Sequence, residues 1–234
     1  MTAKTSTATS ASTGTHTGTG IGTGTPTGIG TRSLLAAAVA ATPVWAVVSL
    51  AQALTRDGFD LTRHPLSALF TGSLGWIQIA NFLLVGALFI AGAAGFRRAL
   101  AGTPGGTWTP RLVRIVGLGM VAAGVFVMDP ADGFPVGTPA GMPATMTWHS
   151  ILHMVSGSVA FIALAAACFV LGRHYTRTGD RADAIASRLA GVALIVGDGW
   201  AMTGGKAGSL TLAIGVTTAM AWVSWTAARL RRPA

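Results

Sequence analysis

The sequence has little charge, one cysteine and no glutamate. Charged residues make up 10% of its 234 residues, whereas about 25% is usual in soluble domains. The single cysteine, Cys168, excludes an intramolecular disulfide framework and a cysteine-rich metal site. All seven acidic residues are aspartates, so any carboxylate chemistry has to use Asp side chains. The low charge, together with 51% hydrophobic residues, indicates a membrane protein.

Hydrophobic residues form six runs of about 20 residues, the length that crosses the hydrocarbon core of a bilayer. The runs cover 33–54, 74–96, 112–128, 148–172, 187–203 and 209–228. The fifth has the weakest signal, because Asp198 interrupts it. Gly and Ala are frequent in the runs, which suits close helix packing in lipid. We therefore predict an all-α, polytopic membrane helix bundle with six transmembrane helices.

Basic residues predict the orientation of this bundle. With the N-terminus inside, 13 of the 16 basic residues fall on the cytoplasmic side, and only Arg56, Arg63 and Lys206 lie outside it. This asymmetry follows the positive-inside rule with both termini cytoplasmic. It also explains the net charge of +9 without nucleic acid, which we do not expect as a partner. The predicted partner is the lipid bilayer, and a small-molecule ligand stays unidentified.

Residues 1–31 form a low-complexity tail of Thr, Gly, Ser and Ala. Such a composition buries no core, so we predict a disordered cytoplasmic tail. The transmembrane domain then takes residues 32–234. Its first apolar run is long enough to span a bilayer, so we expect it to stay as an anchor rather than to be removed as a signal peptide.

Ionisable residues gather at the outer end of the predicted bundle, in the segments RDGFDLTRHPLS, DPADGFP and TWHSILH and near the end of the fifth run. Such groups are costly to place at the edge of a hydrocarbon layer, so each is a candidate for function. They are Asp57, Asp60, His64, Asp129, Asp132, His149, His153 and Asp198.

His149 and His153 are four residues apart, so they share one face of a helix and could ligate one divalent metal ion such as zinc. Asp129 could complete three protein ligands and leave a position open for water. In a metal-dependent hydrolase, Asp132 or His64 would then act as the general base. Alternatively, the two histidines hydrogen-bond to backbone carbonyls or Asp side chains, relay protons or hold haem.

Two further sets of side chains have ordinary and functional interpretations. Five of the eight methionines also fall at the outer end, where thioether and imidazole together would suit copper and Met alone would suit adaptable packing. They are Met128, Met142, Met146, Met154 and Met202. Gln78 and Asn81 lie three apart in the second run, and we predict that they hydrogen-bond to a neighbouring helix.

Several of these motifs resemble a known family. HPLS, GWIQIANF and DPADGFP occur in this order and on the same side, followed by TWHSILH. Together they resemble the bacterial membrane proteins catalogued as domain of unknown function 998, over a stretch from about Leu34 to the C-terminal helix. The resemblance implies a six-helix, multi-pass protein of the bacterial plasma membrane. It implies no activity and no catalytic residues.

The chain is also loosely similar to membrane hydrolases of the alkaline ceramidase kind, which use Ser, Asp and three His around zinc in a helical bundle. It offers Ser67, Asp129, His149 and His153, but its final helix has no histidine pair. We therefore predict an integral membrane protein with a polar, His/Asp-containing site at its outer face. The alternative is a metal-dependent membrane hydrolase that acts on an outer-leaflet lipid or a similar substrate.

Overall fold

The computed structural model describes residues 30–232, which form six α-helices and one short 3-10 helix. The elements are α1 (Thr31–Thr55), η1 (Leu66–Phe70), α2 (Gly75–Ala99), α3 (Trp108–Val125), α4 (Trp148–Thr178), α5 (Arg181–Met202) and α6 (Gly208–Arg231). The predicted all-α class is confirmed, and each helix overlaps one of the six apolar runs. The tail predicted over 1–31 lies outside the described residues, apart from its last two.

Five of the helices, α1, α2, α4, α5 and α6, are long and apolar enough to cross a membrane. The exception is α3, which has only 18 residues and carries Arg111 and Arg114 near its start. The expectation that the fifth run would be the weakest was wrong. Helix α5 is long and apolar enough to cross a membrane in spite of Asp198, whereas α3 is not. Two arginines lower the hydropathy of a short helix more than one aspartate lowers that of a longer one.

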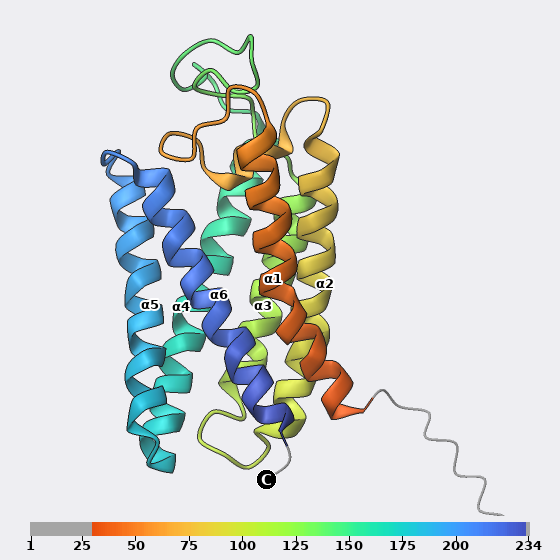
Figure 1. Ribbon diagram of the computed structural model, residues 1–234, viewed down its shortest axis with the longest axis vertical. Helices are drawn as coiled ribbons and strands as arrows, with labels where there is room; N and C mark the ends of the chain where they lie inside the picture. Colours follow the sequence, from red (N-terminus) through yellow and green to blue (C-terminus); the bar gives the residue numbers. More distant parts are fainter. Residues whose placement is uncertain (1–29, 233–234) are drawn as a thin grey trace, which may run out of the picture.

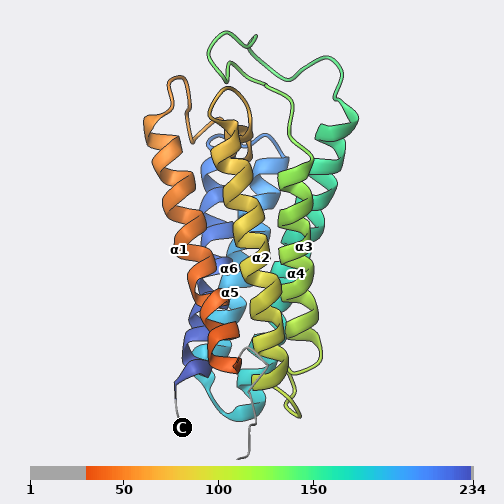
Figure 2. The same ribbon diagram turned by 90° about the vertical axis from the view of Figure 1, so that its right-hand side faces the viewer.

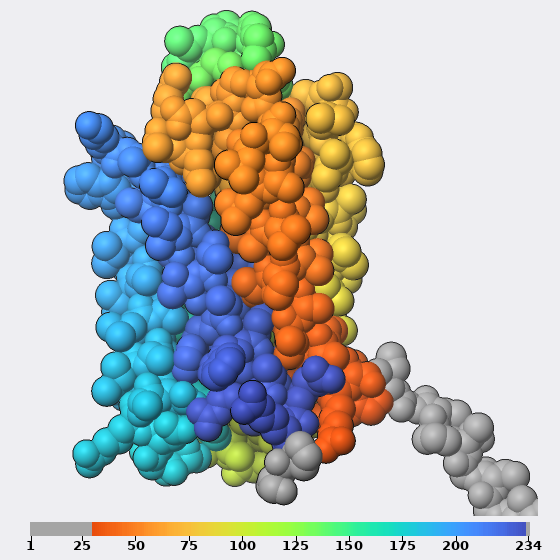
Figure 3. All heavy atoms as spheres, in the orientation of Figure 1, coloured from red at the N-terminus to blue at the C-terminus, as the bar shows by residue number. Residues whose placement is uncertain are grey.

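The six helices form a ring of alternating direction. Each helix packs against the next one in the chain, and α6 returns to pack against α1 (Figures 1 and 2). The start of α1 and the end of α6 lie at the same end, which we call the terminal end (Figure 1). The opposite end carries the loops 56–74 and 126–147, which we call the cap. In Figure 3 these loops are stacked over the bundle, with 126–147 outermost.

Glycines allow the closest approaches between helices. A Cβ atom on Gly86 of α2 would lie 2.7 Å from the carbonyl oxygen of Gly117 in α3, and one on Gly117 would lie 2.6 Å from that of Gly86. A Cβ atom on Gly92 would meet Ala38 of α1 at 2.5 Å. Small residues at such positions bring two backbones together and so increase van der Waals contact, which drives helix association in lipid.

Buried amides join α1 to α2 near the cap. The Gln78 Nε2 atom donates to the Ser49 hydroxyl over 3.0 Å, and the Gln52 Nε2 atom donates to Gln78 Oε1 over 2.8 Å. The Asn81 Nδ2 atom donates to the backbone carbonyl of Trp45 over 3.3 Å. The prediction that Gln78 and Asn81 bond to a neighbouring helix is therefore confirmed.

The paired glycines make a testable prediction about stability. We expect Gly86→Ala to destabilise the bundle by about 1–3 kcal/mol, the usual cost of overpacking, because the methyl group meets a backbone oxygen that has no room to move. The measurement is the thermal unfolding midpoint in a non-ionic detergent. Gly157→Ala in α4 is the matched control, since a Cβ atom there meets nothing within 4 Å. Equal midpoints for the two variants would contradict the prediction.

Candidate functional site

Arg56, directly after α1, holds the two cap loops together. Its guanidinium donates to the backbone carbonyls of Leu69 over 2.7 Å and Thr71 over 2.6 Å, at the end of η1. The same group lies over the ring of Phe134 in the second loop, 4.7 Å from the ring centroid. Phe134 is only 1% exposed and packs edge-on against Phe59. Arg56 and Phe134 therefore fix the second loop to the first.

His64 adds a second link between the loops. Its Nδ1 atom accepts the backbone N–H of Asp60 over 3.0 Å, and its Nε2 atom lies 2.9 Å from the carbonyl oxygen of Asp132. A carbonyl only accepts, so Nε2 carries the proton, and the ring is the neutral Nε2–H tautomer. The structure thus brings together the two residues predicted as general-base candidates, but the contact joins the His64 ring to the Asp132 backbone and not to its carboxylate.

The Asp132 carboxylate completes this link. Its Oδ1 atom lies 2.8 Å from the Arg63 guanidinium, and it also accepts the backbone N–H of Gly141 over 3.2 Å. Hydrogen bonding to Arg63, followed by that to Gly141, lowers the pKa of the Asp132 carboxyl from its usual 3.8. Asp132 adopts a left-handed backbone conformation (φ 51°), which Asp tolerates better than most residues. Its Oδ2 atom accepts from Arg63 Nε over 3.2 Å, so both carboxylate oxygens hold the cap.

Asp129 closes the second cap loop at its base. Its carboxylate accepts the backbone N–H of Thr147 over 2.8 Å and the hydroxyl of the same residue over 2.7 Å. Thr147 is the N-cap of α4, where its side chain accepts from the backbone N–H of Ser150. These bonds, chiefly that from the Thr147 backbone, lower the pKa of the Asp129 carboxyl from 3.8. The ionised carboxylate of Asp129 therefore holds the N-cap residue of α4 in place.

The two histidines of α4 lie in different surroundings. The Nδ1 atom of His153 lies 2.9 Å from the carbonyl oxygens of Ala123 and Phe126 at the end of α3. It must therefore be the donor, and Nε2 of the neutral ring is an acceptor. His149 is exposed, and its ring packs against that of Trp148 at 3.6 Å between centroids. The spacing of four residues alone did not reveal this difference.

The predicted metal ligands His149, His153 and Asp129 thus make three separate sets of contacts. Within residues 30–232, no group of three or more His, Cys, Asp or Glu side chains is placed to hold a metal ion. Carbonyl contacts of a ring Nδ1–H are compatible with ligation by Nε2, so the metal set stays a prediction that metal analysis can test.

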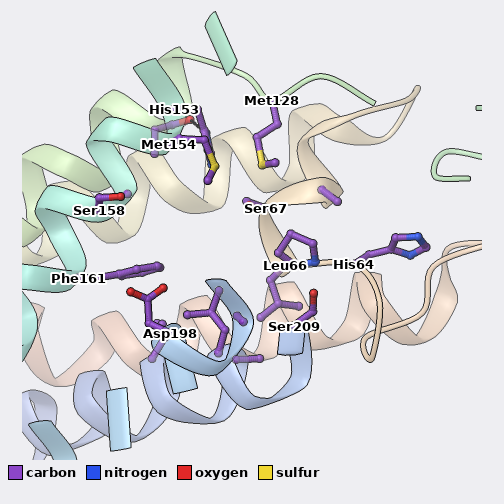
Figure 4. Close-up of a pocket in the computed structure, with 18 of the residues that line it drawn as sticks. His64, Leu66, Ser67, Met128, His153, Met154, Ser158, Phe161, Asp198 and Ser209 are labelled. Carbon is purple, nitrogen blue, oxygen red and sulfur yellow. Dashed lines mark hydrogen bonds between the residues drawn. The ribbon is translucent and has the colours of Figure 1, made fainter. Parts of the chain in front are cut away.

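A cavity of about 560 Å³ lies under the cap, between η1 and the halves of α3, α4, α5 and α6 nearest the cap (Figure 4). Its lower wall includes Val116 of α3, Leu164 of α4 and Met220 of α6. Val116 lies nine residues before the end of α3, a depth of about 14 Å at 1.5 Å per residue. The cavity thus extends from the polar cap into the apolar half of the bundle.

Methionines line this cavity to an unusual extent. All seven methionines of residues 30–232 contribute to its wall, and the eighth in the sequence is Met1. They are Met120, Met128, Met142, Met146, Met154, Met202 and Met220. The sequence pointed to five of them at the outer end. It gave no sign that Met120 and Met220, buried deeper in α3 and α6, face the same space.

The remaining polar groups of the cavity come from several elements. Ser67 lies on η1, Ser158 on α4 and Asp198 on α5, while Ser209 on α6 donates to the backbone carbonyl of Arg63 over 2.8 Å. In Figure 4 the Asp198 carboxylate points into the cavity toward Phe161. The sequence predicted that His64, Asp132 and Asp198 lie at one end of the bundle. It did not predict the roles of Arg56 and Phe134, and the only signal for Phe134 was its place in the DPADGFP motif.

The fold defines a multi-helix integral membrane protein with a large cavity under a polar cap. A family model described as "Protein of unknown function (DUF998)" matches residues 39–229, and the chain belongs to this family. The resemblance seen in the sequence is confirmed. No curated protein and no solved structure matches the chain.

Asp129 makes a testable prediction about pH. A carboxyl whose folded pKa is lowered stabilises the protein above its unfolded pKa, and that contribution is lost as the pH falls through the folded value. We therefore expect the unfolding midpoint of the wild-type protein to drop as the pH falls below about 4. Asp129→Asn should have a lower midpoint at pH 7 and a shallower drop in acid. The measurement is thermal unfolding between pH 7 and pH 3, and parallel curves for the two proteins would refute the role of Asp129.

Proposed function

We propose that this protein binds an amphiphilic small molecule in the cavity under the cap, with the apolar part of the molecule between α3, α4 and α6. The observation that carries the proposal is the gathering of seven methionines, from four helices and the second cap loop, around one cavity. Met side chains are unbranched and polarizable, and surfaces rich in them adapt to apolar ligands of different shape. A polar, His/Asp-containing rim at the mouth would then receive the polar end of the ligand.

The size and depth of the cavity support this proposal. A volume of about 560 Å³ falls within the range of about 300–1,000 Å³ that is typical of small-molecule sites. Its charged groups lie in the cap or, as Asp198 does, near it, whereas Val116, Leu164 and Met220 form an apolar lower wall. A molecule that matches this wall has one polar and one apolar end, as lipids and lipid-like compounds have.

The charge distribution supports a location of the cap on the outer side of a bacterial plasma membrane. Of the 15 basic residues in 30–232, all but Arg56, Arg63 and Lys206 lie on the segments of the terminal end. Arg56 and Arg63 are occupied within the cap. By the positive-inside rule the terminal end, with both chain termini, would be cytoplasmic. The proposed ligand then enters from the outer leaflet or the outer solution.

The hydrolase alternative makes a different prediction. It requires about one divalent ion per chain, held by His149, His153 and Asp129. The separate contacts of these residues favour a binding protein, so we expect no stoichiometric metal in protein purified without chelator. The measurement is elemental analysis. Stoichiometric zinc that disappears in a His149→Ala/His153→Ala variant would overturn this expectation and favour the hydrolase.

Filling the cavity tests the proposed binding. Gly157 lies in the cavity wall, and a Cβ atom added there meets nothing within 4 Å. We expect Gly157→Phe to lower the affinity for 1-dodecanol, a neutral amphiphile, by about tenfold or more, because the ring occupies the space of the ligand. The measurement is equilibrium binding of radiolabelled 1-dodecanol to protein in phosphatidylcholine nanodiscs, with protein-free nanodiscs subtracted.

The matched control is Gly199→Phe in α5. A Cβ atom at Gly199 also meets nothing within 4 Å, but this residue lies outside the cavity. Gly199→Phe should bind 1-dodecanol as the wild-type protein does. Absence of saturable binding to the wild-type protein, or equal binding to all three proteins, would refute the proposal.

A further inference from the structure

The cavity contains one charged side chain within a membrane-spanning helix. Asp198 lies in α5, four residues before the helix ends at Met202, a depth of about 6 Å at 1.5 Å per residue. Its carboxylate is half-buried and points across the cavity toward Phe161 of α4 (Figure 4). Its position thus lies below the cap, at the level where the polar mouth gives way to the apolar wall.

The other charged groups that line the cavity already have partners. Arg63 pairs with Asp132, and Asp129 accepts two hydrogen bonds from Thr147. Asp198, in contrast, has no hydrogen bond or ion pair within residues 30–232. The nearest cation in sequence, Lys206, does not line the cavity. Among the described residues, the cavity therefore presents one carboxylate without a partner, that of Asp198, to whatever occupies it.

An unpartnered carboxylate is costly in such a place. A charged side chain in a membrane helix is rare, usually faces a cavity and is usually paired, because the surrounding medium does not solvate it. A cationic group of a ligand removes this penalty when it pairs with the carboxylate. Phe161 across the cavity adds an aromatic face, and cations are attracted to such faces. The combination selects for positive charge over a neutral or anionic polar end.

From this geometry we infer that the ligand is an amphiphilic amine whose ammonium group pairs with Asp198 while its apolar part lies against the methionines. This inference rests on the proposed binding function and names the chemical class of the ligand. An ammonium group could belong to a free long-chain amine or to the headgroup of a lipid such as phosphatidylethanolamine. Both have the same chemistry at Asp198.

The test compares dodecylamine with 1-dodecanol, which has the same chain and a neutral polar end. Both are measured by equilibrium binding to protein in phosphatidylcholine nanodiscs, with protein-free nanodiscs subtracted to remove partitioning. The wild-type protein should bind the amine about tenfold more tightly than the alcohol, which corresponds to a free-energy difference of about 1.4 kcal/mol. Asp198→Asn should lose this preference and bind the alcohol unchanged.

Two control variants test whether the preference for the amine depends on the charge of Asp198. Asp198→Glu keeps the charge and should keep a preference for the amine. Asp57→Asn removes an exposed carboxylate of the cap that does not line the cavity, so it should behave as the wild-type protein does. If Asp198→Asn does not fold, the comparison of amine and alcohol in the wild-type protein and in Asp198→Glu still decides.

The outcomes separate this inference from the function on which it rests. Equal affinity of the wild-type protein for amine and alcohol, or an unchanged preference in Asp198→Asn, overturns the ammonium site while alcohol binding upholds the cavity as a binding site. Failure of both probes to bind overturns both. Competition by phosphatidylethanolamine placed in the nanodiscs would identify the lipid headgroup as the source of the ammonium group. Its absence, with amine binding intact, would identify free amines.

Discussion

The contact between Arg56 and Phe134 is the interaction on which the cap and the cavity beneath it depend. The guanidinium uses its donors on two carbonyls of the first cap loop and its flat face on an aromatic ring of the second. Arg is suited to both tasks at once, because its planar group hydrogen-bonds at the edge and stacks on the face. His64 and Asp132 then add directional bonds beside it. Without these links the cavity would have no fixed roof.

The cavity itself follows from how the ring of helices is packed. Paired glycines let α2 and α3 touch backbone to backbone at Gly86 and Gly117. Large side chains such as Phe89, Phe96 and Leu171 are fully buried toward the terminal end, and α4 contacts α6 directly across the ring. In the half nearest the cap, flexible Met side chains line the cavity. The terminal end of the bundle is therefore a packed core, whereas the end near the cap contains the cavity.

The sequence predicted the fold better than the site, for a physical reason. An apolar run of about 20 residues is a local signal, so all six helices were found, although the ranking of α3 and α5 was wrong. Topology also placed His64, Asp132 and Asp198 at one end. Which of them touch depends on loop conformation and on neighbours 68 residues apart in the chain, as for His64 and Asp132. A spacing of four residues put His149 and His153 on one helix face, but depth along the helix exposes one and buries the other.

Asp198 lies in the half of the bundle that contains the cavity, and not in the packed half. A carboxylate at the centre of a membrane helix costs about 2.5–3.5 kcal/mol on insertion scales, and the cost falls toward the helix end, where Asp198 lies. Pairing it within the protein would remove the cost, yet the cations of the cap are committed to Leu69, Thr71 and Asp132. The guanidinium groups of Arg56 and Arg63 therefore do not pair with Asp198. A ligand that supplies a positive charge gains binding free energy from a penalty that the free protein already carries.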